Sequence, residues 1–398
     1  MRTQPQDVIA KLEADNSRLA KEKILLDAMN EGLDEFFEGL KMCLDKLYTF
    51  GVKQVPTKDE VVAGQGCPWN VFKDLAEKLY NRELTGHNAR DAINLVMSSA
   101  TAEQWNGFYR RILIKDLRCG VSEKTVNSVA KKNKFGKYMV PVFTCQLAHD
   151  SANHEKKLVG KKMLEVKLDG VRTLAIVHPD GKVDMLSRNG KEFTNFGHIQ
   201  DEISAVVKQD PPPYPLVLDG EVMSENFQDL MKQVHRKGSA DAKDAVLHLF
   251  DFIPLEEFKK GKWDKTQTLR TAMLKAWYQK HETNLNAVRV LDHEIVDLDT
   301  PEGQTTYTEV NKRAVQGGYE GIMIKDLEAP YECKRSHAWL KLKPFIEVSL
   351  EIKATEEGTG RNVGKLGALI CEGVDDGKKI KTNVCLLYTS PSPRDGRE

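Results

Sequence analysis

Residues 164–172, LEVKLDGVR, place a lysine between two carboxylates at a spacing of two residues. If this stretch forms a strand, Glu165, Lys167 and Asp169 lie on one face, because side chains alternate along a strand. The glycine that follows permits a sharp turn that brings Arg172 to the same side. An exposed ladder of ion pairs is the plainer alternative for an isolated strand. Similar groups recur elsewhere in the chain, and this recurrence favours a functional site over an ion-pair ladder.

Such groups do recur further along the chain. Glu221 lies in a segment whose apolar residues alternate, and Glu320 precedes another such segment. Carboxylates of this kind can hold Mg²⁺. Lys341 and Lys343 share one face of a third predicted strand, where they repel each other unless an anion such as a phosphate covers them. Phe252 offers a flat face on which a base can stack.

The pattern suits a lysine nucleophile. A free lysine has a pKa of about 10.4 and is almost wholly protonated at neutral pH, so it cannot attack. Burial, a bound divalent cation and neighbouring cations all disfavour the ammonium form. Since the groups above would supply all three around Lys167, the residues predict attack on a phosphorus and a lysine–phosphate adduct.

A helical region followed by a sheet-containing region must position these groups. Over roughly the first 130 residues, apolar side chains such as Leu33, Phe36, Phe37 and Leu40 recur at helical spacing. Further on, the period switches to the alternation typical of strands. We expect helices near 198–208 and 268–280, and strands at 163–169, 171–177, 183–187, 216–223, 246–253, 321–325 and 339–343.

Charge is balanced over the chain but not locally. The 398 residues include 59 Lys and Arg and 59 Asp and Glu, so the formal net charge is zero. A chain-wide basic surface for nucleic acid is therefore excluded. Residues 120–175, however, contain eleven basic and five acidic residues. This excess, which includes Lys131, Lys132 and Lys134, predicts a phosphate-facing stripe, although a solvated charged face is the plainer alternative.

Composition also bounds the cellular setting. No apolar run approaches the roughly 18–20 residues of a membrane-spanning helix, and the N-terminal segment has no signal-peptide core. Seven cysteines are scattered without a Cys-x-x-Cys pair or zinc spacing. This distribution is typical of reduced thiols. We therefore expect a soluble, cytoplasmic, monomeric protein without membrane association.

Six motifs in a fixed order resemble those of a known superfamily. KLDGVR at 167–172 resembles the Lys-x-Asp-Gly-x-Arg signature of the covalent nucleotidyltransferases. It is followed by SRNG at 187–190, LDGE at 218–221, FDF at 250–252, EGIMIK at 320–325 and WLKLKP at 339–344. In the helical region, LTG at 84–86 and DLRCGVS at 116–122 resemble the N-terminal domain of bacteriophage-type ATP-dependent DNA ligases. The resemblance covers nearly the whole chain.

This resemblance implies a reaction in three steps. Lys167 attacks the α-phosphorus of ATP, expels pyrophosphate and becomes a lysyl–AMP phosphoramidate. The AMP passes to the 5′-phosphate at a nick, and the 3′-hydroxyl then displaces it and seals the strand. Glu320, with Glu221 or Asp169, would hold Mg²⁺, for which Mn²⁺ can substitute. The implied partner is nicked duplex DNA, as arises in replication, repair and recombination, while clamp or other protein partners stay open.

The same resemblance implies a set of ATP-binding side chains. Glu165 would lie beside the adenine, and Phe252 would stack on it. Arg172, Arg188 and Glu221 would contact the ribose or the nick phosphate. Lys341 and Lys343 would contact the α-phosphate.

The implied architecture is a multidomain α+β protein. An all-α DNA-binding domain (1–140) precedes an α+β adenylation domain (141–345), which is a nucleotidyltransferase domain of ATP-grasp-like type with antiparallel sheets. A partial oligonucleotide-binding (OB) fold follows at 346–384, where residues 358–365 would form a hairpin and not a P-loop. The tail at 385–398 resembles foreign sequence, so we expect a truncated barrel, ATP binding and poor nick sealing.

Three alternatives remain beside the DNA ligase. An RNA ligase or an mRNA-capping guanylyltransferase shares the lysine signature, although the helical region argues against capping. A catalytically silent nucleic-acid-binding relative is disfavoured by the retention of the lysine and carboxylate motifs together. An NAD-dependent ligase is disfavoured because the chain shows no zinc-type cysteine spacing.

Overall fold

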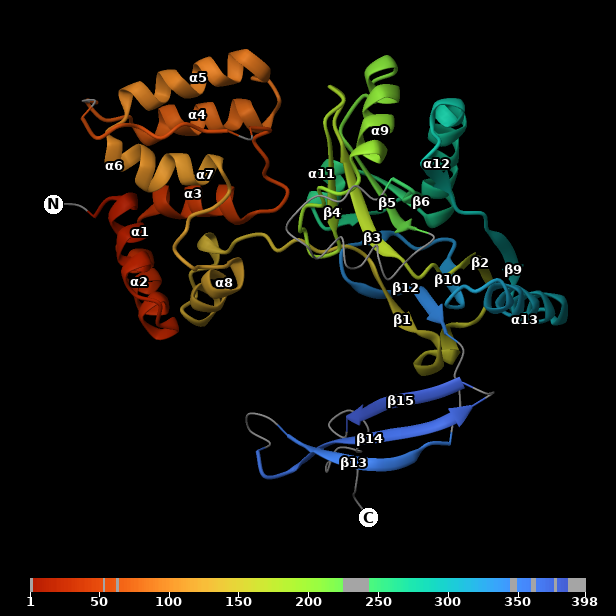
Figure 1. Ribbon diagram of the computed structural model, residues 1–398. Coiled ribbons are helices and arrows are strands. Elements are labelled where there is room, and N and C mark those ends of the chain that lie inside the picture. The colour runs from red at the N-terminus through yellow and green to blue at the C-terminus, as the bar shows by residue number, and fades with distance from the viewer. Residues whose placement is uncertain are drawn as a thin grey trace. The chain divides into compact units, whose positions relative to one another are not determined.

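The computed structural model describes residues 3–52, 54–61, 64–224, 243–343, 349–358, 363–375 and 378–385. Contacts divide the chain into two compact units, Met1–Leu342 and Lys343–Glu398. The larger unit contains a helical region and two five-stranded sheets, and the smaller one a three-stranded sheet (Figure 1).

The regular elements among the described residues up to Tyr138 are all helices, as the apolar spacing predicts. Phe36, Phe37 and Leu40 are buried on one face of α3, and Ser122 caps α8 by accepting a hydrogen bond from the backbone of Thr125. The main helices are α1 (Pro5–Ala14), α2 (Arg18–Asn30), α3 (Asp34–Leu44), α4 (Trp69–Tyr80), α5 (Gly86–Ser99), α6 (Ala102–Gln104), α7 (Arg110–Leu113) and α8 (Glu123–Lys132).

The first five-stranded sheet has the order β4-β3-β5-β6-β8. Neighbouring strands are antiparallel except for β6 and β8, which are parallel. Helices α9 (Gly197–Gln209) and α12 (Gln267–His281) pack against it (Figure 1). The strands are β3 (Val171–Val177), β4 (Val183–Ser187), β5 (Leu216–Met223), β6 (Val246–Pro254) and β8 (Val288–Val290).

The second five-stranded sheet has the order β1-β12-β10-β2-β9. Its β1 and β12 are parallel, and the other pairs are antiparallel. Helix α13 (Pro301–Gln316) packs on β9 and β2. The strands are β1 (Leu147–Asp150), β2 (Lys161–Val166), β9 (Glu294–Asp297), β10 (Ile322–Asp326) and β12 (Arg335–Leu342). Short helix α11 (Leu255–Lys259) and a β7–β11 pair (Lys262–Trp263 with Tyr331–Glu332) complete the unit.

The predicted strands and helices of this region are present, with two informative differences. The strand expected over 163–169 ends at Val166, so the lysine of the motif lies in a loop. Helix α13 was not predicted, because only Gly303, Val310 and Ala314 are buried along its sixteen residues. With so few apolar residues, the helical repeat in this segment is too weak to predict a helix from the sequence.

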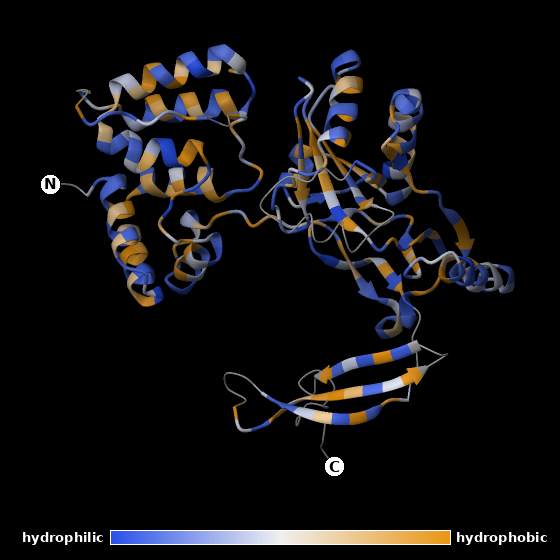
Figure 2. Cartoon of the chain, in the orientation of Figure 1, coloured by the Kyte–Doolittle hydropathy of each residue, from blue (hydrophilic) through white to orange (hydrophobic). Residues whose placement is uncertain are grey.

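The smaller unit is an antiparallel sheet in the order β13-β14-β15. Its strands are β13 (Glu351–Glu357), β14 (Leu366–Asp375) and β15 (Lys378–Cys385), and Figure 2 shows that they carry both apolar and polar residues. β13 and β14 are antiparallel, and the Gly358 N–H donates to the Lys365 carbonyl at 2.9 Å, while residues 359–362 of the expected hairpin lie outside the described residues. Residues 386–398, most of the expected foreign tail, lie outside the described residues.

Two further observations concern the described residues alone. None of their helices is long and apolar enough to cross a membrane. Cys43, Cys67, Cys119, Cys145, Cys333 and Cys371 are buried and unpaired, in agreement with the reduced thiols expected from the sequence.

Candidate active site

Lys167 begins the loop that follows β2. Its backbone N–H donates to the Gly321 carbonyl at 2.8 Å, and the Glu320 N–H donates to the Lys167 carbonyl at 3.1 Å. Its ammonium group contacts the Glu320 carboxylate. The two side chains are 19% and 26% exposed, so the lysine is shielded but reachable. The structure thus brings together two residues that the sequence separates by 153 positions.

Glu165 is buried, and its partner was not among the predicted site residues. Its carboxylate lies 2.7 Å from the ammonium of Lys325, and the two side chains are 3% and 1% exposed. Burial raises the pKa of Glu165, and Lys325 opposes that rise. Lys325 lies two residues along β10 from Met323, which pairs with Glu165. The EGIMIK motif was the available signal, since alternation places Met323 and Lys325 on one face.

Arg172 is held by a buried carboxylate. Its guanidinium binds both oxygens of Asp219, at 2.6 and 2.7 Å, and Asp219 is fully buried. The Tyr331 hydroxyl donates to the same carboxylate at 2.7 Å. A bidentate pair of this kind fixes the plane of the guanidinium. Asp219 was seen in the sequence as part of a motif, but its role as the anchor of Arg172 comes from the structure.

Phe250, and not Phe252, is the aromatic residue of β6 that lies among the charged groups. Its half-buried ring has Arg172 Cζ at 4.9 Å and Lys325 Nζ at 4.9 Å from its centroid. Phe252 is 6% exposed within the hydrophobic core of the first sheet. The expectation that Phe252 offers a free face for a base therefore does not fit the structure, because core side chains cover its ring.

The ring of Trp339 also lies beside Arg172 and Lys325, and hydrogen bonds fix its position. Lys325 Nζ lies 4.6 Å and Arg172 Cζ 5.4 Å from its ring. Its indole N–H donates to Gln267 at 2.8 Å, and Gln267 accepts a hydrogen bond from Arg270. Because these polar groups are all satisfied, the network fixes the orientation of Trp339.

The predicted metal ligands are only partly brought together. Glu221 faces Arg172 across the β3–β5 pair. Burial raises the pKa of Glu221, while Arg172 and Lys167 oppose the rise. The positive charge of Lys167 therefore interacts with two carboxylates, those of Glu221 and Glu320. Asp169 is exposed, and among the described residues the three carboxylates do not form a cluster with all ligand atoms within 4.8 Å of one another.

The remaining predicted ATP contacts occupy the ends of strands. Lys341 is half-buried on β12 and pairs with Met323, which in turn pairs with Glu165. Lys343 directly follows β12 and begins the smaller unit. Arg188 is exposed in the turn after β4. Burial raises the pKa of the Cys145 thiol to about 11, and the positive charges of Arg172 and Arg188 oppose that rise.

The basic segment between residues 120 and 175 carries fewer available cations than its count suggests. Lys137 pairs with Asp34 and Lys162 with Asp326. The two basic motif residues are also paired, Lys167 with Glu320 and Arg172 with Asp219. Three lysines at the C-terminal end of α8 are exposed, and none of them forms an ion pair within the described part of the chain. These are Lys131, Lys132 and Lys134.

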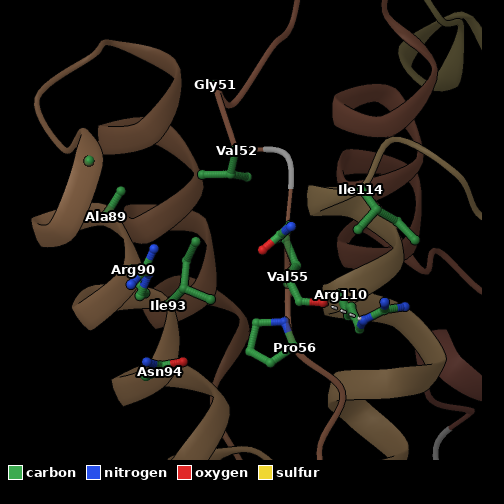
Figure 3. Close-up of a pocket in the computed structure, with 12 residues that line it drawn as sticks. Gly51, Val52, Val55, Pro56, Ala89, Arg90, Ile93, Asn94, Arg110 and Ile114 are labelled. Carbon is green, nitrogen blue, oxygen red and sulfur yellow. Dashed lines mark hydrogen bonds between the residues drawn. The ribbon is translucent and has the colours of Figure 1, made fainter.

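The helical region contains a separate cavity of about 780 Å³. It lies between α5, α7 and the segment around Val55 (Figure 3). Its described lining includes Arg90 and Arg110 but neither a lysine nor a carboxylate. Because Lys167 and the carboxylates around it lie elsewhere, this cavity is not the candidate active site.

The sheet region matches a known protein family. Residues 145–343 match the model described as ATP dependent DNA ligase domain. A probable DNA ligase of Rhodococcus opacus is 30% identical over 235 residues, which cover 56% of this chain and 42% of that protein. A probable DNA ligase of Mycolicibacterium gilvum is 27% identical over 323 residues, covering 76% and 60%. The chain spans about two-fifths of the length of the first curated relatives it matches.

A solved structure is similar over almost the whole chain. The protein titled Pmar-Lig_PreS3 is 60% identical, with a TM-score of 0.64, and the match covers 96% of this chain and 88% of that one. The related structure titled Pmar-Lig_Pre. gives a TM-score of 0.63 at the same identity.

Proposed function

The chain belongs to the ATP-dependent DNA ligase family, and on this premise we propose that it seals nicks in duplex DNA through an AMP adduct on Lys167. The observation that carries the proposal is the contact between the Lys167 ammonium and Glu320, beside Glu221 and the pair of Arg172 with Asp219. A shielded amine surrounded by fixed charges of both signs is what nucleophilic attack on a phosphate ester requires.

The first step joins lysine and nucleotide. The Nζ lone pair of Lys167 forms a bond to the α-phosphorus of ATP, the bond to the bridging oxygen breaks, and pyrophosphate leaves. The amine must first lose a proton, and the Glu320 carboxylate is in contact with it and orients it. Loss of this proton costs least when the site is partly desolvated, as the low exposure of both side chains provides.

Different side chains bind the base and the phosphates. Glu165 and Lys325 form a buried pair that offers hydrogen-bonding groups to adenine. Phe250, beside Arg172 and Trp339, is our choice for the stacking platform. Arg172, held by Asp219, contacts the ribose or the nick phosphate together with Arg188 and Glu221. Lys341 and Lys343 contact the α-phosphate.

Glu221 and Glu320 fit a hard divalent cation. Both are carboxylates that act on Lys167, and Mg²⁺ prefers oxygen ligands. When bound, Mg²⁺ would neutralise charge on the phosphates of the substrate, and Mn²⁺ can take its place. The exposed Asp169 would have to move to join this set.

DNA binding is assigned to the exposed lysines of α8. Lys131, Lys132 and Lys134 extend into solvent at the C-terminal end of that helix. Lysine ammonium groups bind phosphates without regard to sequence. This agrees with an enzyme that must act at any nick, and the three-stranded smaller unit is proposed to be the OB-type part of the enzyme.

The test is incubation of the full chain with α-labelled ATP and Mg²⁺, followed by denaturing electrophoresis and then by addition of nicked duplex. We expect a labelled protein band with ATP but not with GTP or NAD, absent in Lys167→Ala and retained in Lys161→Ala. Label should then move to DNA and the nick should close, and the rate of closure tests the poor sealing expected from the sequence. Labelling of another lysine would refute the nucleophile, and preference for GTP would favour the capping alternative.

A further inference from the structure

Three histidines meet at the edge of the second sheet, outside the site around Lys167. His149 lies on β1, His154 follows the short turn after β1, and His337 lies on β12. Each offers one ring nitrogen, and these three nitrogens all lie within 4.8 Å of one another. His337 Nε2 is 3.2 Å from His154 Nδ1. The rings of His149 and His337 are stacked, with centroids 4.4 Å apart.

We propose that this histidine cluster (His149, His154 and His337) binds a divalent transition-metal ion of the borderline class, of which Zn²⁺ is the representative. Neutral imidazole is a ligand that Zn²⁺, Cu²⁺ and Ni²⁺ accept, whereas Mg²⁺ and Ca²⁺ prefer oxygen. Three imidazole nitrogens with overlapping reach are the protein part of a four-coordinate site with one open position.

The spacing of the nitrogens agrees with a shared ion. Zinc lies about 2.0–2.1 Å from imidazole nitrogen, so two ligands at a tetrahedral angle are roughly 3.3–3.4 Å apart. The His337 Nε2 to His154 Nδ1 distance of 3.2 Å is close to that value. The His149 nitrogen lies within 4.8 Å of the other two, and its ring, now stacked on that of His337, would have to rotate to aim at the same point.

The backbone is irregular at the place that assembles the cluster. Ala148 pairs with Ser336, but the next residue, His149, pairs with Leu340. Three consecutive residues of β12, beginning with His337, therefore have no partner in the β1 ladder. Such bulges re-aim side chains and are frequent beside functional sites. In an unbroken register His149 would pair with His337, and the two rings still stack here although the ladder shifts at this point.

The cluster is accessible. His337 is exposed, and His149 and His154 are half-buried, so an ion can enter and a water molecule or another ligand can complete its coordination. A bound ion would tie β1 and the turn after it to β12, the strand that also carries Lys341. Since the ion would bind only the folded chain, it should raise the thermal stability. This inference does not depend on the proposed ligase reaction.

The experiment uses the full chain without a histidine tag, titrated with Co²⁺ as a spectroscopic substitute and then with Zn²⁺. We expect one equivalent of Co²⁺ to give the intense visible bands of a four-coordinate ion with nitrogen ligands, and Zn²⁺ to abolish them. The melting temperature should rise with either metal and should not rise with the same concentration of Mg²⁺.

His337→Gln and His154→Gln should each weaken Zn²⁺ binding at least tenfold by calorimetry, which is the lower end of what lost metal-site partners cost. His87→Gln, at an exposed histidine of α5, is the matched control and should bind like the parent. Because His337 is exposed, its replacement is not expected to unfold the chain. Unchanged affinity in both cluster variants, bands typical of thiolate ligands, or no stoichiometric binding would overturn the proposal.

Discussion

Lys167 and Glu320 are joined twice, once through their side chains and once through the backbone. The Lys167 ammonium contacts the Glu320 carboxylate, and the Glu320 N–H donates to the Lys167 carbonyl at 3.1 Å. The loop after β2 and the segment before β10 therefore hold the Lys167 ammonium and the Glu320 carboxylate in one geometry. Rotation of one side chain alone would break the side-chain contact but not the backbone connection.

Glu320→Gln tests the side-chain half of this relationship. The amide keeps the shape but cannot balance the ammonium or ligate a cation well, so we expect the rate of lysine labelling from ATP to fall by roughly 100-fold or more. Glu328→Gln, at an exposed position near the end of β10, should leave the rate unchanged. The measurement is single-turnover labelling, with circular dichroism to show that both variants fold.

The two phenylalanines of β6 should respond differently to truncation. Phe250→Ala should weaken ATP binding by roughly 5- to 150-fold, which corresponds to about 1–3 kcal/mol of base stacking, with a modest loss of stability. Phe252→Ala should cost about 3–5 kcal/mol of unfolding free energy because it empties a core position. Urea unfolding and ATP titration separate the two effects. If instead Phe252→Ala folds normally and loses ATP, the stacking platform has been assigned to the wrong ring.

The buried pair of Glu165 and Lys325 should be costly to break from one side. Lys325→Met leaves a carboxylate without its partner at a site that is 3% exposed, so we expect a loss of about 3–5 kcal/mol in unfolding free energy at pH 7. Replacing both residues with apolar ones should recover most of it. Removal of the exposed pair of Arg18 with Glu22 should cost no more than about 0.5 kcal/mol. Equal losses for the two pairs would contradict this prediction.

His178 should make the stability depend on pH. Burial, together with Lys182, lowers the pKa of His178 from 6.5 to about 4. Between these values the unfolded chain binds a proton here that the folded chain does not, so stability falls as the pH drops through this window. His178→Gln should reduce the loss between pH 7 and pH 5 by roughly 1–2 kcal/mol, as measured by urea unfolding. His87→Gln should leave the loss as it is.

The lysines of α8 should set the salt dependence of DNA binding. In a plot of log affinity against log salt, each phosphate contact contributes a slope of about 0.9. Replacing Lys131, Lys132 and Lys134 with Ala should flatten the slope by up to roughly 3 units and leave lysine labelling from ATP nearly intact. A double replacement of Lys208 and Lys312, exposed lysines of α9 and α13, is the control. An unchanged slope in the triple variant would move the DNA surface elsewhere.

The sequence by itself determined the features that depend on local periodicity. Alternation in LVLDGEVM and in EGIMIK placed β5 and β10 to within a residue, because the period of a strand is visible in any single segment. The match of KLDGVR to the family signature likewise predicts Lys167 as the nucleophile. For these features no knowledge of the partner strands was needed.

Only the tertiary structure decided which residues become partners. Glu165 and Lys325 belong to different strands, and the register between β2 and β10 makes them a pair. An irregularity in the β5–β6 ladder leaves Phe250 without a cross-strand partner, and core packing covers Phe252. Register and bulges are set by contacts between segments distant in sequence, and a shift of one residue turns a side chain to the other face. No single segment carries that information, and the same holds for the histidines that β1 and β12 bring together.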